Sequence, residues 1–228
     1  MNIYLIRHGE SEQNVNKTGY IKSDRDIPLT ANGHCQAKET AKFMSSIISK
    51  KEKTVIITSP YLRTRQTSFP IEQELKLKPI YDERLREYER GKFGDYTLEE
   101  CEKLFPQELE NFKKRLKSKD KFFACPPGGE SGFDVTCRMK GIKFVLEKLD
   151  AFGCDNVIIV SHCGAIKSLL VLLCGYDALW YAQERNMTNG SVRKLVKDGN
   201  KYIDEHIIFK GYKNKIETTA EMDSEKDY

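Results

Sequence analysis

Residues 1–10 of the chain read MNIYLIRHGE and contain the pattern that is most informative about the fold. The run Ile3–Ile6 is short, apolar and bounded by polar residues, which is typical of a strand buried inside a sheet. Arg7 and His8 follow it directly. A single histidine at a strand end is most often a packing or hydrogen-bonding residue. Whether His8 has a functional role therefore depends on which residues follow the other strands.

Two later runs have the same buried character. They are 54–58 and 157–160, and each is followed by a longer amphipathic stretch. Strands that alternate with helices imply βαβ units, so the sequence predicts an α/β fold with a mainly parallel sheet covered on both faces. The other predicted elements are strands at 77–81, 190–197 and 202–209 and helices at 30–51, 98–104, 106–117, 131–152 and 163–174.

Two predicted helices begin with a capping pattern. Thr30 is a favourable N-cap for the helix that runs to about Lys51. Ser59 and Pro60 place a capping side chain before a proline, which is the favoured order at a helix start. We therefore expect the next helix to begin at Pro60, immediately after the strand at 54–58.

Three of the predicted strands end in basic or imidazole side chains. The first ends in Arg7 and His8, the second is followed one helical turn later by Arg63, and the strand at 157–160 is followed by His162. Because parallel strands point the same way, these ends share one edge of the sheet, where ligands of open α/β sheets bind. The amino ends of two helices add partial positive charge. Such a pocket suits a dense anion, and a phosphoryl group held by forked arginine donors fits best.

Composition argues against several other classes of protein. The chain has 228 residues, a net charge of +4 and no apolar run longer than six residues, so we expect no membrane span and no nucleic-acid partner. Its start lacks the pattern of a signal peptide. The seven cysteines form no CxxC pair, and no HExxH or His-x-His spacing occurs, so we expect reduced thiols, no metal site and a cytoplasmic protein. His34, His206 and Arg65 have no comparable setting and are expected at the surface.

The order of the polar residues resembles the histidine phosphatase superfamily, also called the phosphoglycerate-mutase-like family. The resemblance covers about residues 1–209, and its segments occur in the family's order and spacing. They are Arg7-His8-Gly9-Glu10-Ser11 with Asn14; Pro28-Leu29-Thr30 with Gly33, Gln36 and Ala37; Ser59-Pro60 with Arg63, Gln66 and Thr67; Leu85-Arg86-Glu87 with Gly91; Gly129-Glu130-Ser131 with Asp134; and Ser161-His162 with Gly164. The Arg-His-Gly motif alone is weak, whereas the ordered set is specific.

The resemblance implies a three-layer α/β/α sandwich. We expect a single catalytic domain at 1–211 and a polar, flexible C-terminal tail at 212–228. Glu130 and Asp134 resemble helix-opening residues, and we favour a structural role for them.

The resemblance also implies a covalent phosphohistidine intermediate. By position, His8 would be the nucleophile and Glu87 the proton donor. The remaining implied residues bind the phosphoryl group: Arg7, Arg63 and His162 as a clamp, with Asn14 as a further ligand.

The chemistry of attack sets conditions on His8. Its imidazole attacks phosphorus only in the neutral form. Arg7 and Arg63 nearby would lower its pKa, because they disfavour a third positive charge. A backbone carbonyl in the region of Gly9 that accepts the other ring proton would fix the tautomer.

Proton donation sets a second condition, on Glu87. Its carboxyl must be protonated to release an alkoxide. The arginines would lower its pKa and a bound phosphate would raise it again, so we expect Glu87 to take its proton mainly once substrate is bound. A structural salt bridge to Arg84 or Arg86 is the alternative for this side chain.

Two activities share the first half-reaction and differ in the acceptor of the phosphoryl group. A mutase shields the phosphohistidine from water and grips a second acidic group on its substrate. Residues 88–91 read Tyr-Glu-Arg-Gly where glycolytic mutases carry Arg-His-Tyr-Gly, whereas 113–115, Lys-Lys-Arg, stand near the position of the mutases' paired arginine. The segment 116–128 is shorter than the mutase insertion, which favours a phosphatase. The alternative is a phosphoglycerate mutase, and only that activity would need 2,3-bisphosphoglycerate as a cofactor.

A non-catalytic phospho-ligand module is a third possibility. It would be marked by loss of His8 or Glu87, and both are present. The expected partner in every case is a phosphorylated small molecule, and substrate choice would fall to the segments 9–29 and 88–128. The sequence does not indicate an oligomeric state.

Overall fold

A six-stranded sheet forms the centre of the molecule, whose computed structural model describes residues 1–15, 24–49 and 51–212. The strands are β1 (Asn2–Arg7), β2 (Thr54–Thr58), β3 (Pro79–Tyr81), β4 (Asn156–Ser161), β5 (Val192–Asp198) and β6 (Lys201–Phe209). Their order is β3-β2-β4-β1-β5-β6, and β5 runs in the opposite direction to the other five strands. The predicted mainly parallel sheet is confirmed. The predicted tail at 212–228 lies, from residue 213 on, outside the described residues.

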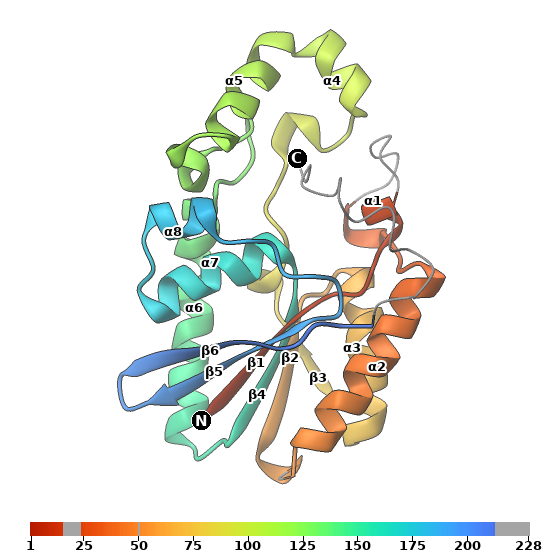
Figure 1. The fold of residues 1–228 in the computed structure, drawn as a ribbon, viewed down its shortest axis with the longest axis vertical. Helices are drawn as coiled ribbons and strands as arrows, with labels where there is room; N and C mark the ends of the chain where they lie inside the picture. The colour runs from red at the N-terminus through yellow and green to blue at the C-terminus, as the bar shows by residue number, and fades with distance from the viewer. Residues whose placement is uncertain (16–23, 50, 213–228) are drawn as a thin grey trace.

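Helices cover both faces of this sheet and give the predicted three layers (Figure 1). They are α2 (Ala31–Ile47) and α3 (Leu62–Leu75) on one face, and α6 (Gly132–Ala151) and α7 (Cys163–Cys174) on the other. Successive side chains of a strand point to opposite faces, so Ile3 and Leu5 pack with α6 and α7, whereas Tyr4 and Ile6 pack with α2 and α3. Burial on both faces explains the unbroken apolar run at the start of the chain.

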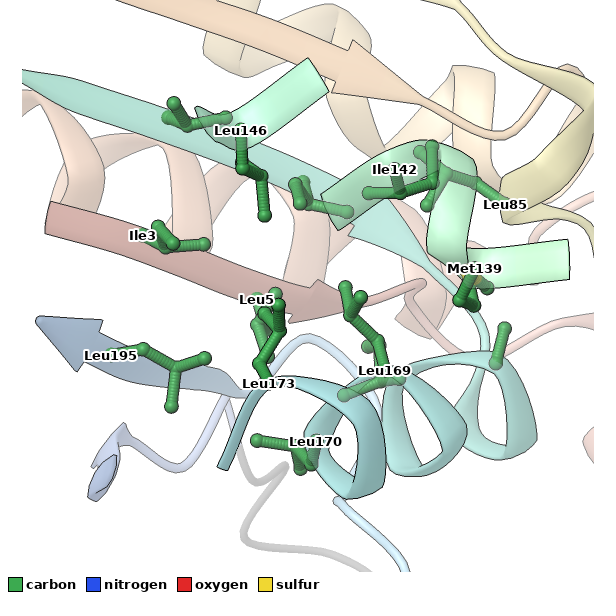
Figure 2. Packing of buried hydrophobic residues seen from close by; sticks show 14 of the residues in the cluster. Ile3, Leu5, Leu85, Met139, Ile142, Leu146, Leu169, Leu170, Leu173 and Leu195 are labelled. Atoms are coloured by element: carbon green, nitrogen blue, oxygen red, sulfur yellow. The ribbon is translucent and has the colours of Figure 1, made fainter. Parts of the chain in front are cut away.

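The larger apolar cluster fixes α6 and α7 to the sheet (Figure 2). Each helix contributes a stripe at helical spacing. The stripes contain Met139, Ile142 and Leu146 of α6 and Leu169, Leu170 and Leu173 of α7. Because α7 begins directly after β4, this packing also fixes where the residues at the start of α7 lie.

A pair of short helices stands beyond the carboxyl ends of the strands rather than against either face (Figure 1). They are α4 (Leu98–Leu104) and α5 (Pro106–Leu116), close to the predicted ranges. Thr97 and Glu100 form a capping box at α4, and Pro106 takes the first position of α5. The pair covers the edge of the sheet where a ligand was predicted to bind.

The start of α3 differs from the prediction. The helix begins at Leu62 instead of Pro60, and its N-cap, Tyr61, makes no side-chain capping hydrogen bond. Ser59 does not cap the helix, because its Oγ lies 2.9 Å from Nε2 of His162. This tertiary contact engages the hydroxyl that a capping bond would need.

Other boundaries also shift. The helix after Thr30 ends at Ile47 rather than Lys51, because the buried Ile48 takes an extended conformation. The strand predicted at 77–81 is shortened to β3, since Lys76 ends α3 in a left-handed conformation with φ of 56°. The elements without a sequence prediction are α1 (Glu12–Val15), α8 (Ala178–Gln183) and the 3₁₀ helices η1 (Asp24–Asp26), η2 (Lys51–Lys53), η3 (Glu83–Leu85), η4 (Gly91–Phe93) and η5 (Lys119–Phe123).

The described residues also bear on the predictions about surface residues, cysteines, membrane spans and metal sites. His34, His206 and Arg65 are exposed, as predicted. All seven cysteines are free. No helix in the described part of the chain is both long enough and apolar enough to cross a membrane. Across 1–15, 24–49 and 51–212, no group of three His, Cys, Asp or Glu side chains is placed to hold a metal ion.

Candidate active site

The ends of β1, β2 and β4 meet at one edge of the sheet. Arg7 pairs in register with Ser161, and the amide of His8 donates to the Ser161 carbonyl at 3.0 Å. The imidazoles of His8 and His162 come within 5.3 Å between ring centroids, at an interplanar angle of 61°. Segments more than 150 residues apart in sequence therefore place two imidazoles side by side.

His8 is held in one tautomer. Its Nδ1 lies 2.7 Å from the carbonyl oxygen of Gly9. Because a carbonyl only accepts, Nδ1 carries the proton and Nε2 keeps its lone pair. Burial, followed by the charges of Arg63 and Arg7, holds the pKa of His8 well below its usual 6.5. This lowered pKa favours the neutral imidazole near neutral pH.

The chain around Gly9 is packed too tightly for a side chain. A Cβ on Gly9 would stand 2.5 Å from the carbonyl oxygen of Gly33, and one on Gly33 would stand 1.9 Å from that of Glu10. The amide of Gly9 donates to Oγ1 of Thr67, and that of Glu10 donates to Oε1 of Gln36. These contacts give four residues of the sequence pattern a physical role: they fix the loop that carries His8.

Arg63 lies beside the histidines and is 2% exposed. It reaches them from the first turn of α3. One guanidinium nitrogen donates to the backbone carbonyl of Asp24 at 2.6 Å, and another forms an ion pair with its carboxylate at 3.1 Å. The partner Asp24 was not predicted, since nothing in the sequence connects η1 to α3.

Arg7 and Asn14 line the same cavity as His8 and Arg63. The Arg7 guanidinium donates to the Met187 carbonyl. Asn14 is exposed, and its Oδ1 accepts from the Ser11 amide at 3.0 Å and from Nδ2 of Asn189 at 3.2 Å. The structure thus brings both predicted residues to the site, with Asn14 at its rim.

His162 sits at the N-cap of α7 and is fully buried. Burial, followed by Arg63 and His8, holds its pKa well below 6.5. Its Nδ1 and the Nε atoms of Arg7 and Arg63 are buried without a hydrogen-bond partner in the described part of the chain. Buried polar atoms that lack a partner cost free energy, and the two arginine Nε atoms are donors, so this arrangement fits a ligand rich in acceptor oxygens.

Glu87 lies at the amino end of α7, where its carboxylate accepts from the Gly164 and Ala165 amides at 3.2 and 3.1 Å. A Cβ on Gly164 would come within 2.7 Å of the Glu87 carboxylate, so only glycine allows this approach. Burial raises the pKa of Glu87 and outweighs the opposing effects of the Gly164 amide and of Arg63. The expectation that the arginines dominate in the unliganded protein is therefore wrong.

The alternative salt bridge for Glu87 is not formed. Arg84 pairs with Asp82 at 2.5 Å, and Arg86 pairs with Glu89 at 3.1 Å. Both arginines are thus engaged with other carboxylates. The Glu87 carboxyl remains in the wall of the cavity.

The helix-opening residues take the structural positions predicted for them. Asp134 completes a capping box with Ser131 at α6. Glu130 forms an ion pair with Arg138 at 2.9 Å and also borders the cavity. Arg138 in turn donates to the backbone carbonyls of 84, 86 and 87, which fixes the segment that carries Glu87.

A cavity of about 150 Å³ joins these residues to the helices above them. Part of its wall comes from the segment 88–128, which was predicted to determine substrate choice: Tyr88, Arg90, Phe112, Leu116 and Lys121. Other wall residues were not singled out from the sequence, and they come from α7, from α8 and from the chain after α8: Cys163, Lys167, Tyr181 and Asn186. For Lys167 the sequence offered only helical spacing, since it lies four residues after Cys163 on the helix that follows His162.

Comparisons with known proteins agree with this arrangement. Residues 3–206 match the family described as histidine phosphatase superfamily (branch 1). A probable phosphoglycerate mutase of Serratia proteamaculans is 34% identical over 186 residues, which is 81% of this chain and 79% of that protein. The alpha-ribazole phosphatase of Shigella flexneri has a TM-score of 0.75 at 20% identity, covering 94% of this chain and 100% of its own. A mycobacterial glucosyl-3-phosphoglycerate phosphatase has a TM-score of 0.73 at 22% identity, covering 90% and 97%. These two structures share the fold.

Proposed function

The chain belongs to branch 1 of the histidine phosphatase superfamily, and we propose that it is a phosphomonoesterase. It hydrolyses small phosphorylated metabolites through a phosphohistidine on His8. The observation that carries the proposal is the neutral imidazole of His8, with its Nδ1 proton on Gly9 and its Nε2 lone pair beside Arg7, Arg63 and His162. The names of relatives include both phosphatases and mutases.

In the first step Nε2 of His8 attacks phosphorus, and the bond from phosphorus to the ester oxygen breaks. Arg7 and Arg63 stabilise the charge on the equatorial oxygens, so catalysis rests on positioning and electrostatics. Glu87 gives its proton to the departing oxygen. Since burial raises the pKa of Glu87, the carboxyl is disposed toward the protonated form before substrate binds. This chemistry uses no cofactor and no metal.

In the second step water attacks the phosphohistidine, and the nitrogen–phosphorus bond breaks. The Glu87 carboxylate, left ionised by the first step, accepts the proton of that water. Inorganic phosphate leaves, and His8 returns to its neutral form. Glu87 therefore acts first as an acid and then as a base.

The basic residues 113–115, which stand near the position of the mutases' paired arginine, do not supply a mutase-type grip on a second acidic group. Lys113 instead pairs with Glu102 at 3.0 Å and Lys114 with Glu110 at 2.7 Å. Arg115 donates to the carbonyl of Phe123 at 2.6 Å. All three lie outside the cavity wall.

A direct assay separates the two activities. We expect the protein to release inorganic phosphate from p-nitrophenyl phosphate and from 3-phosphoglycerate without any added cofactor. Interconversion of 2- and 3-phosphoglycerate that depends on 2,3-bisphosphoglycerate, with little hydrolysis, would instead establish the mutase. Turnover in neither assay would leave the binding module as the function of the fold.

A further inference from the structure

A second cationic group lies in the wall of the active-site cavity, apart from the two histidines. It consists of Lys167 of α7 and Lys121 of η5, and neither is used by the mechanism above. We propose that Lys167, assisted by Lys121, binds a carboxylate on the substrate, so that the enzyme selects phosphomonoesters of small hydroxy acids. This inference rests on the proposed function.

Lys167 is placed unlike a surface lysine. The residue is only 5% exposed, and its Nζ donates to the backbone carbonyl of Glu184 at 2.6 Å. The same Nζ stands 4.9 Å from the centroid of the Tyr181 ring. The Glu184 carboxylate is engaged by Arg193 at 2.6 Å. Within the described ranges, Lys167 forms no ion pair with a carboxylate, so its ammonium group has two further donors to offer in the wall of the cavity.

Lys121 brings a second positive charge to the same space. Burial, followed by the charge of Lys121, lowers the pKa of Lys167 to about 8. Two like charges that line the same space disfavour each other. A carboxylate bound there would interact favourably with both ammonium groups, as charge-assisted hydrogen bonds do.

The spacing along α7 relates this group to the phosphate site. His162 is the N-cap of the helix and Lys167 follows five residues later, which is roughly 7.5 Å along the helix axis. Helix α5 adds the apolar side chains of Phe112 and Leu116 to the cavity wall. The cavity thus has one basic group at the phosphate site, a second at Lys167 and Lys121, and apolar side chains in its wall. This arrangement suits a ligand in which a short carbon chain joins a phosphoryl group to a carboxylate.

The test compares two esters that differ in one group. 3-Phosphoglycerate carries a carboxylate where glycerol 3-phosphate carries a hydroxymethyl group. We expect Lys167→Met to lower kcat/KM for 3-phosphoglycerate by about 10- to 100-fold and to change that for glycerol 3-phosphate by less than about 3-fold. Lys121→Met should act in the same direction. The exposed neighbour Lys119 gives the matched control, and Lys119→Met should leave the ratio of the two substrates unchanged.

Binding gives a readout that needs no turnover. Calorimetric titration of both esters into His8→Ala protein, with and without Lys167→Met, should show selective loss of 3-phosphoglycerate affinity, and Lys167→Arg should restore it. If the wild-type protein hydrolysed neither ester, such a selective loss of affinity would defeat the proposed function and leave this inference standing. Equal losses for both esters, or no loss, would overturn the inference whatever the activity.

Discussion

His8→Ala should lower kcat/KM for phosphate release by at least about 10³-fold, because it removes the nucleophile and leaves only positioning and charge stabilisation. The effect should be the same for every ester, since both half-reactions pass through Nε2. The side chain is buried and neutral, so the substitution removes no charge from the core. Phosphate released from p-nitrophenyl phosphate measures the loss, and circular dichroism verifies the fold.

The chain supplies a matched control for this variant. His34 is exposed on α2, away from the cavity, and His34→Ala should keep wild-type turnover. If His8→Ala retained more than about a tenth of the activity, covalent catalysis at His8 would be ruled out. A phospho-ligand module would retain much of its binding after the same substitution.

Glu87→Gln should affect the hydrolysis of different substrates differently, according to whether the leaving group needs a proton. For alkyl phosphates we expect kcat to fall by about 10²- to 10⁴-fold, because the alkoxide lacks its general acid. For p-nitrophenyl phosphate the first step needs no proton, whereas the second step lacks its base. We therefore expect a rapid burst of p-nitrophenolate followed by slow turnover.

The pH dependence of the same variant follows from the raised pKa of Glu87. Donation requires the protonated carboxyl, so wild-type activity on alkyl phosphates should fall as the pH rises through that pKa. Glu87→Gln should remove this limb of the profile. The pKa values of His8 and His162 lie well below 6.5, so their protonation should not limit the rate between pH 6 and 8.

The exposed Glu89 offers the control for Glu87. Its carboxylate pairs with Arg86 at the surface, and Glu89→Gln should preserve both the leaving-group ratio and the pH profile. An equal loss for alkyl and p-nitrophenyl esters in Glu87→Gln, without a burst, would mean that Glu87 only holds the start of α7 in place.

The convergence of the strand ends was predictable because it depends on chain direction alone. The runs at 3–6, 54–58 and 157–160 are buried strands, and parallel strands deliver their carboxyl ends to one edge. The shared direction of these strands is enough to predict that His8, Arg63 and His162 lie together, and the structure places them so. Glu87 follows an irregular segment, so only the family resemblance pointed to it.

The parts that were not predicted depend on tertiary contacts. Ser59 reads locally as a helix cap, yet its hydroxyl is engaged by His162. Asp24 pairs with Arg63 from η1, a short element that no periodic pattern in the sequence predicts. Lys167 lies on an apolar helix, and its exposure to the cavity depends on where α8 and η5 pack. Local patterns therefore indicated the chemistry of the site but not the wall that surrounds it.

His8 should become transiently phosphorylated during turnover, and the phosphohistidine can be trapped when its hydrolysis is slowed. Glu87→Gln protein would be mixed with p-nitrophenyl phosphate, quenched in alkali because the phosphohistidine bond is acid-labile, and digested for mass spectrometry. The account predicts one phosphoryl group per chain, located on His8 and absent from His8→Ala protein treated in the same way. A phosphoryl group on another residue, or none during continuing turnover, would contradict it.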